Sequence, residues 1–257
     1  MGRRERKKRS RPPPLKKALI KSSSRVNHAA PAAALALPAP PPAAGWFAVD
    51  SHAVRVGSGA ADFAAAAAAV KGWAHANALP WVAVTRPDGR AGGSGRATAP
   101  APGDPVVIAA RTTGPLALGP WLANPLVVVG VREGAGKSAR WRTRGGPAVA
   151  AAAALPSPPD AVPVTSRYEV ALATTASHVL AGGERFSVTR RAADDSVWFE
   201  ATAFARPASV AAAAGWPVVR GLQAAFRRGA GEAVRAAAVA GGGEGVRRRG
   251  RGWRGLW

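Results

Sequence analysis

The fold is decided by residues 183–204, which read GERFSVTRRAADDSVWFEATAF. The first eight residues alternate between two faces, and a period of two is typical of a β-strand. One face carries Glu184, Phe186 and Val188, and the other carries Arg185, Ser187 and Thr189. A polar turn at residues 193–195 leads to a second β-rich run at residues 196–204. The pattern predicts an antiparallel hairpin.

Helical patterns lie on both sides of this hairpin. Residues 208–238, interrupted at 215–217, carry Val218, Leu222 and Phe226 at four-residue steps, so these three side chains share one face of a helix. Residues 62–77 are rich in alanine and predict a second helix. Short β-branched runs predict further strands at residues 51–57, 81–84, 106–108 and 126–129. The order strand, helix, at least five strands and long helix predicts an α+β domain.

Composition places the boundaries of this domain at residues 46 and 239. Residues 1–45 are basic and then rich in alanine and proline, and they predict a disordered tail because prolines prevent a continued helix and like charges repel. Residues 240–257 predict a second disordered tail, rich in glycine and arginine. Residues 134–166 predict a low-complexity insertion within the domain, either a loop or a retained intron.

The chain has 257 residues and a formal net charge of +22, most of it in the tails. The first 26 residues hold eleven basic side chains and one acidic side chain, and the last 17 hold five and one. Such tails bind phosphates and other polyanions without sequence preference. Because the chain lacks the signature of a recognition module, we expect no specific nucleic-acid binding. The N-terminal basic run also fits a nuclear-import signal or an organelle-targeting segment.

The residue types exclude several kinds of site. The chain has no cysteine, which excludes disulfides, thiol catalysis and Cys-ligated metals. His52 and His75 have no carboxylate or second histidine at ligand spacing, so no metal is expected. The Gly-Lys-Ser run at residues 136–138 lacks the first glycine and the following helix of a phosphate-binding loop, and no cofactor is expected. Prolines interrupt the long uncharged stretches, which argues against a transmembrane helix.

His178 is the single side chain best suited to chemistry. It stands between the polar residues 174–177 and an apolar run that begins at residue 179. In this position it is suited to orient a polar group of a ligand or to carry a proton. The competing interpretation is a hydrogen-bonded histidine at the start of a strand.

Glu184 and Glu200 are not expected to form an acid–base pair. The predicted hairpin register places Glu200 opposite Val188, which is about 13 Å from Glu184 at ~3.3 Å per residue. The two carboxyl groups of glycosidases lie about 5–9.5 Å apart. Each glutamate is therefore expected to have a structural role, such as pairing with Arg185 or Arg206.

Several sequence blocks resemble one family, the uncharacterised plant and bacterial proteins called UPF0548 or DUF1990. The blocks are HAxxVGSGxxxF at residues 52–63, PWxxNPLV at 120–127, HxLAGGERFSV at 178–188, VWFE at 197–200, ARP at 205–207 and GWP at 215–217. Their order and spacing agree with the family from about residue 51 to residue 237, apart from the insertion. The chain departs from the family at Gly183, where a glutamate is usual, and it lacks two glycines before His178. The resemblance therefore bears on the fold more than on any activity.

The family has no agreed biochemical role. The order of elements looks similar to helix-grip domains of the START type, in which a curved antiparallel sheet wraps a long C-terminal helix and encloses an apolar cavity. Plant members of the family look like plastid-envelope proteins, and an ion-conducting pore has been proposed in that setting. The resemblance implies a helix-grip fold, and it favours a plastid location with membrane association, whereas the N-terminal basic run favours the nucleus.

The first hypothesis is non-enzymatic binding of a small lipophilic ligand in a cavity between sheet and helix. The candidate ligand-binding residues are His178, Glu184, Phe186, Trp198, Glu200, Arg206 and Phe226, with Val188, Phe204 and Leu222 as further lining. Because Trp198 and Phe199 are both apolar, the sequence does not decide which of the two points inward. One alternative is an ion-conducting pore at the plastid outer envelope, although the predicted strands are shorter than the about 9–11 residues that cross a membrane. The other is an enzyme that uses His178 and Glu184.

Overall fold

The structure is a computed structural model that describes residues 48–85, 99–136, 139, 141–143 and 162–251, with side chains from residue 50 to residue 241. One antiparallel sheet contains β1 (Ala48–Ser58), β2 (Val82–Thr85), β3 (Pro105–Arg111), β4 (Trp121–Gly134), β6 (Val164–Thr174), β7 (Leu180–Arg191) and β8 (Ser196–Pro207). The strands lie in the order β1-β8-β7-β6-β4-β3-β2, and the short β5 (Trp141–Thr143) pairs with β4. The predicted tail at residues 1–45 lies wholly outside the described residues.

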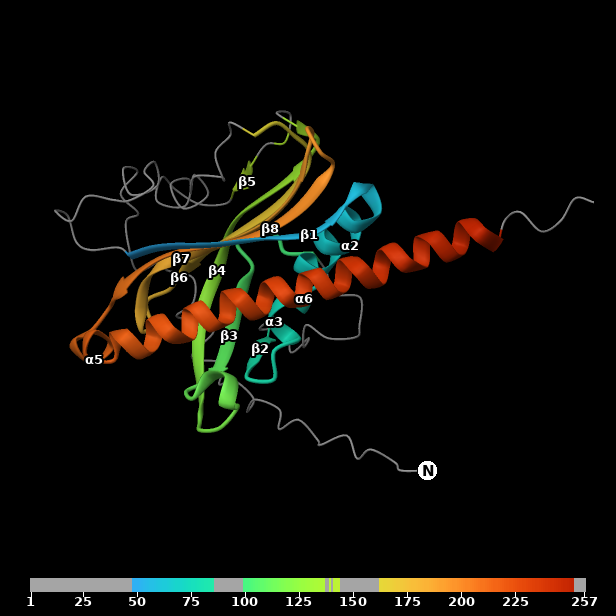
Figure 1. Cartoon of the computed structure of the whole chain (residues 1–257). Coiled ribbons are helices and arrows are strands. Elements are labelled where there is room, and N and C mark those ends of the chain that lie inside the picture. The colour runs from blue at the N-terminus through green and yellow to red at the C-terminus, as the bar shows by residue number, and fades with distance from the viewer. Residues whose placement is uncertain (1–47, 86–98, 137–138, 140, 144–161, 252–257) are drawn as a thin grey trace, which may run out of the picture.

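Within the residues that the structure describes, four α-helices and one 3₁₀ helix accompany the sheet. They are α2 (Gly59–Lys71), α3 (Ala74–Asn77), α5 (Val210–Ala214), α6 (Trp216–Arg251) and η3 (Gly114–Leu116). Figure 1 shows the sheet curling, with α6 lying across one face and α2 and α3 beside it. The predicted fold class is confirmed: an α+β domain in which a curved antiparallel sheet holds an N-terminal helix and a long C-terminal helix.

The predicted β7–β8 hairpin forms, but its register differs by one residue from the prediction. Val188 pairs with Phe199, and Glu200 pairs with Ser187 rather than with Val188. The difference arises in the turn, where Asp195 has a left-handed φ of 58° and the Asp194 carboxylate accepts the Ser196 N–H at 3.1 Å. Successive side chains of a strand point to opposite faces of the sheet. A shift of one residue therefore places each side chain of β8 on the opposite face from the one that was predicted.

The register decides which aromatic side chain of β8 points inward. Phe199 is fully buried in the core, together with Phe186 and Val188 of β7. Trp198 points to the opposite face, where the Arg191 guanidinium lies 4.1 Å from its ring centroid. The core is completed by α6, whose buried side chains recur at four-residue steps at Phe226, Ala230, Val234 and Ala238.

Several element boundaries differ from those predicted. The helix expected at residues 62–77 is split, because Trp73 adopts a left-handed φ of 59° that ends α2 and starts α3. The backbone of α6 continues through residues 240–251, where the sequence predicts a tail, since adding residues to an existing helix is easier than starting one. Strand β6 begins at Val164 and β5 at Trp141, so both lie partly or wholly within the predicted insertion. Residues 144–161 of that insertion lie outside the described residues.

His75 of α3 is the buried core residue that should respond to acid. Its ring is fully buried and lies 4.5 Å from the ring of Phe186, centroid to centroid. Burial lowers the pKa of His75 to about 4, so the ring stays neutral in the folded protein at neutral pH.

We therefore expect His75→Phe to remove an acid-induced loss of stability. Between about pH 6.5 and pH 4 the unfolded chain takes up a proton at His75 that the folded chain does not, so the wild type loses about 3 kcal/mol at ~1.36 kcal/mol per pKa unit. Urea unfolding of both proteins at pH 7 and pH 4 measures this, and each variant's value at pH 7 serves as its own reference. An equal loss of stability in both proteins between these pH values would contradict the prediction.

Candidate functional site

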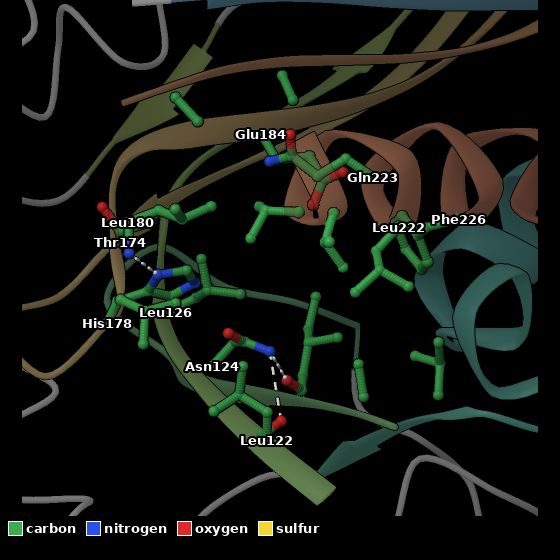
Figure 2. A pocket seen from close by; sticks show the side chains of 18 of the residues that line it. Leu122, Asn124, Leu126, Thr174, His178, Leu180, Glu184, Leu222, Gln223 and Phe226 are labelled. Carbon is green, nitrogen blue, oxygen red and sulfur yellow. Dashed lines mark hydrogen bonds between the residues drawn. The ribbon is translucent and has the colours of Figure 1, made fainter. Parts of the chain in front are cut away.

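A pocket of about 450 Å³ lies between the inner face of the sheet and the first turns of α6 (Figure 2). Strands β3, β4, β7 and β8 supply one wall, and α6 supplies the other. The wall is mostly apolar and includes Trp81, Ile108, Leu126, Leu180, Leu222 and Phe226. Its size lies within the range of about 300–1,000 Å³ that is usual for small-molecule sites.

Local periodicity explains why these side chains face the pocket. On β4, Leu122, Asn124 and Leu126 are two residues apart and therefore point to the same face of the sheet. On α6, Val218, Leu222 and Phe226 are four residues apart and lie on one helical face, as the sequence predicts.

The pocket opens beside the first turns of α6. Leu122 of β4 and Val218 of α6 both line it and remain 41% and 63% exposed. The backbone of η3 packs directly on this part of the helix, since a Cβ added at Gly114 would lie 2.3 Å from the Leu222 side chain. The entrance is therefore bordered by apolar side chains.

His178 lies in the loop between β6 and β7, at one end of the pocket (Figure 2). Its Nδ1 accepts the backbone N–H of Leu180 at 2.9 Å. Burial lowers the pKa of His178 to about 4, so the imidazole is neutral at physiological pH. A neutral ring whose Nδ1 accepts a hydrogen bond carries its proton on Nε2.

Glu184 lies on β7 opposite Ala203, and its side chain lines the pocket near Gln223 of α6 (Figure 2). Burial raises the pKa of Glu184 to about 7, against a smaller lowering effect of the Arg227 charge. That charge is shared, because Arg227 Nη2 lies 3.1 Å from the carboxylate of Asp50. The carboxyl group is thus poised between its neutral and charged forms near neutral pH.

Two further polar side chains in the pocket were given no role in the sequence analysis. Asn124 donates its amide N–H groups to the carbonyl oxygens of Ile108 and Leu122, at 3.0 and 3.3 Å. Gln223 has a buried Oε1 without a hydrogen-bond partner among the described residues. In the sequence, each is a polar residue among apolar neighbours. That pattern does not show which face of the strand or helix points into the pocket.

The structure brings only some of the predicted site residues together. His178, Glu184, Phe226, Phe204 and Leu222 line the pocket. Phe186 and Val188 are buried in the core, outside the pocket wall. Arg206 of β8 pairs with Ala181 of β7 and does not line the pocket either.

The remaining two predicted residues, Trp198 and Glu200, point away from the pocket. Glu200 accepts the Ser51 hydroxyl at 2.7 Å and the Thr202 hydroxyl at 3.0 Å. With Glu200 opposite Ser187, it lies on the opposite face of the sheet from Glu184. The two carboxyl groups are therefore separated by the sheet itself, whereas the sequence-based register separated them along one face.

The described part of the chain offers no metal cage and no membrane-spanning helix. Its His, Asp and Glu side chains form no group of three that could hold a metal ion. None of its helices combines the length and the apolar character that crossing a bilayer requires.

A curved antiparallel sheet, a long C-terminal helix and an apolar pocket between them define a helix-grip α+β domain. The chain belongs to the family described as Domain of unknown function (DUF1990), whose model matches residues 30–233. No curated protein matches the chain. Among solved structures, the crystal structure of Ara h 8.0201 is similar at 13% identity and a TM-score of 0.34, covering 75% of this chain and 99% of that chain.

Proposed function

We propose that this domain binds a small, largely apolar ligand in the pocket between the sheet and α6, without catalysing a reaction. The observation that carries the proposal is the pocket itself, about 450 Å³ with a mostly apolar wall and few polar groups. Pockets of this kind bind ligands through apolar contact and use the few polar groups to fix orientation. The apolar entrance at Leu122 and Val218 gives such a ligand a route into the pocket.

The arrangement of the polar groups supports binding rather than catalysis. In nucleophilic sites the nucleophile and its base are joined by a hydrogen bond, and a third group orients the base. Among the described residues His178 makes its side-chain hydrogen bond to the Leu180 backbone, and no hydrogen bond joins it to Glu184. The pore and the enzyme remain predictions from the sequence.

A pocket-filling variant tests the proposal. Ala203→Phe places a ring in the pocket from β8, opposite Glu184. We expect it to weaken binding of the fluorescent probe 1-anilinonaphthalene-8-sulfonate at least about tenfold, which corresponds to ~1.4 kcal/mol. Fluorescence titration measures the affinity, and near-UV circular dichroism confirms that the variant is folded.

The matched control is Ala211→Phe, since Ala211 lies on the exposed side of α5. It should bind the probe as the wild type does. Equal affinity of folded Ala203→Phe and wild type would show that the probe binds elsewhere and would contradict the proposal. Leu222→Trp, which narrows the entrance from α6, provides a second variant if Ala203→Phe does not fold.

A further inference from the structure

We propose that the ligand carries a hydroxyl group, which binds between the Nε2–H of His178 and the Oδ1 of Asn124. This inference rests on the proposed function, because it specifies the chemistry of what the pocket holds. It is carried by two side chains that line one end of the pocket and whose orientations are fixed by backbone hydrogen bonds.

His178 can only donate to a ligand. Its Nδ1 is occupied by the Leu180 N–H at 2.9 Å, so the neutral ring presents Nε2–H. Figure 2 shows the ring beside the pocket, with the hydrogen-bonded nitrogen turned toward the backbone of Leu180. Among the described residues, the His178 side chain hydrogen-bonds to Leu180 alone. Its Nε2–H can therefore donate to a ligand.

Asn124 can only accept from a ligand. Its Nδ2 lies 3.0 Å from the carbonyl oxygen of Ile108 and 3.3 Å from that of Leu122. Because two carbonyl oxygens require a donor, the amide nitrogen must occupy that side and Oδ1 must occupy the other. In Figure 2, Oδ1 of Asn124 points away from these carbonyls, toward the end of the pocket that holds His178.

One donor and one acceptor at the same end of an apolar pocket match a hydroxyl group. A hydroxyl oxygen accepts from His178 while its proton is donated to Asn124. An ether would satisfy only the histidine, and a hydrocarbon would leave both groups unpaired, which costs about 1–3 kcal/mol for each buried polar group. A carboxylate would place two acceptors against each other, since Asn124 Oδ1 cannot donate.

The nearby hydroxyl of Thr174 does not substitute for this pair. Thr174 Oγ1 accepts the Gly182 N–H at 2.8 Å and donates to the Gly182 carbonyl at 3.0 Å, so it is used to anchor the start of β7. The rest of the ligand then contacts the apolar side chains that line the pocket, such as Leu126, Leu222 and Phe226. The chemical class is therefore an alcohol or phenol with a hydrocarbon body.

The test compares 4-octylphenol, 4-octylanisole and octylbenzene, which share a hydrocarbon body and differ in the group at one end. Each competes with 1-anilinonaphthalene-8-sulfonate for the full chain, and 4-octylbenzoate is added as the anionic analogue. We expect 4-octylphenol to bind at least about tenfold more tightly than octylbenzene and 4-octylbenzoate, from two hydrogen bonds of about 0.5–1.5 kcal/mol each, and at least about threefold more tightly than 4-octylanisole, which keeps the bond from His178.

The variants His178→Leu and Asn124→Leu separate recognition from structure. We expect each to lower the ratio of the octylbenzene to the 4-octylphenol dissociation constant at least about threefold, because each removes one of two hydrogen bonds, while the affinity for octylbenzene stays within about twofold. A merely structural role would weaken both compounds equally and leave the ratio unchanged. His52→Leu, a histidine on β1 outside the pocket wall, is the matched control and should keep the wild-type ratio.

The outcomes distinguish the two proposals. If none of the compounds binds in the pocket, the proposed function itself fails. If the phenol and octylbenzene bind equally well, the pocket function stands and the hydroxyl inference is overturned. Equal affinity for the phenol and the anisole would overturn it as well, since Asn124 would then contribute nothing, and so would tightest binding of the benzoate.

Discussion

Replacing Gly182 with alanine is expected to lower the free energy of unfolding by about 3 kcal/mol, which is at the upper end of the usual cost of overpacking. A Cβ at this position would lie 2.0 Å from the carbonyl oxygen of Phe204 and 2.9 Å from the Cα of Ala205. Both atoms belong to the backbone of β8, so no side-chain rotation can relieve the contact. Strands β7 and β8 would have to separate where they form one end of the pocket.

The matched control is Gly221→Ala, on the exposed side of α6. A Cβ added there meets nothing within 4 Å, and alanine favours a helix over glycine by about 0.5–1 kcal/mol. The two substitutions should therefore have opposite signs in urea unfolding followed by tryptophan fluorescence. If Gly182→Ala were as stable as the wild type, the close approach of β7 and β8 at Phe204 would not exist as described.

The hairpin at residues 183–204 shows which features of this fold can be predicted from the local sequence. Alternation and a polar turn predict both strands, because the period of two is written directly in the sequence. The register is not written there, since it depends on the backbone conformation of Asp195, and φ near 58° is uncommon for a residue other than glycine. A shift of one residue is enough to exchange Glu200 and Phe199 between the two faces of the sheet.

For the helices, too, the sequence predicts what depends on neighbouring residues and misses what depends on tertiary packing. The four-residue spacing of Val218, Leu222 and Phe226 predicts which side of α6 meets the pocket, because a helix face is defined by its own residues. The break between α2 and α3 was missed, since the sequence around Trp73 continues the alanine-rich helical pattern. The packing of Trp73 in the core, where it is 1% exposed, is a tertiary effect that overrides the local preference.

The site was predictable only in part, for a related reason. His178 and Glu184 stand out as polar residues next to apolar runs, and both line the pocket. Asn124 is on β4 and Gln223 is on α6, far from His178 in the sequence, and only the curling of the sheet around the helix brings these residues to one cavity. Their hydrogen-bonding capacity toward a ligand depends on partners such as the Ile108 carbonyl, which no local pattern reveals.

Glu184→Gln is expected to make the protein more stable than the wild type by about 3 kcal/mol above pH 7, and to have little effect near pH 4.5. The pKa of Glu184 is raised from 4.5 to about 7, chiefly by burial, so the folded state holds a proton that the unfolded chain has already lost in this range. Below pH 4.5 both states are protonated and no penalty exists. Between pH 4.5 and pH 7 the stability of the wild type therefore falls by ~1.36 kcal/mol per pH unit, and above pH 7, where the folded protein buries the charged carboxylate, the full loss of about 3 kcal/mol is reached.

The measurement is urea unfolding of both proteins at half-unit steps from pH 4.5 to pH 8.5, and the quantity compared is the difference between their unfolding free energies. Taking the difference cancels the opposite pH dependence of the buried histidines, which both proteins share. Glu232→Gln, on the exposed side of α6, controls for the loss of a surface carboxylate. A difference that stays constant with pH would mean that Glu184 is fully hydrated, and the pocket would then be open to water from end to end rather than the dry, apolar cavity that a lipophilic ligand requires.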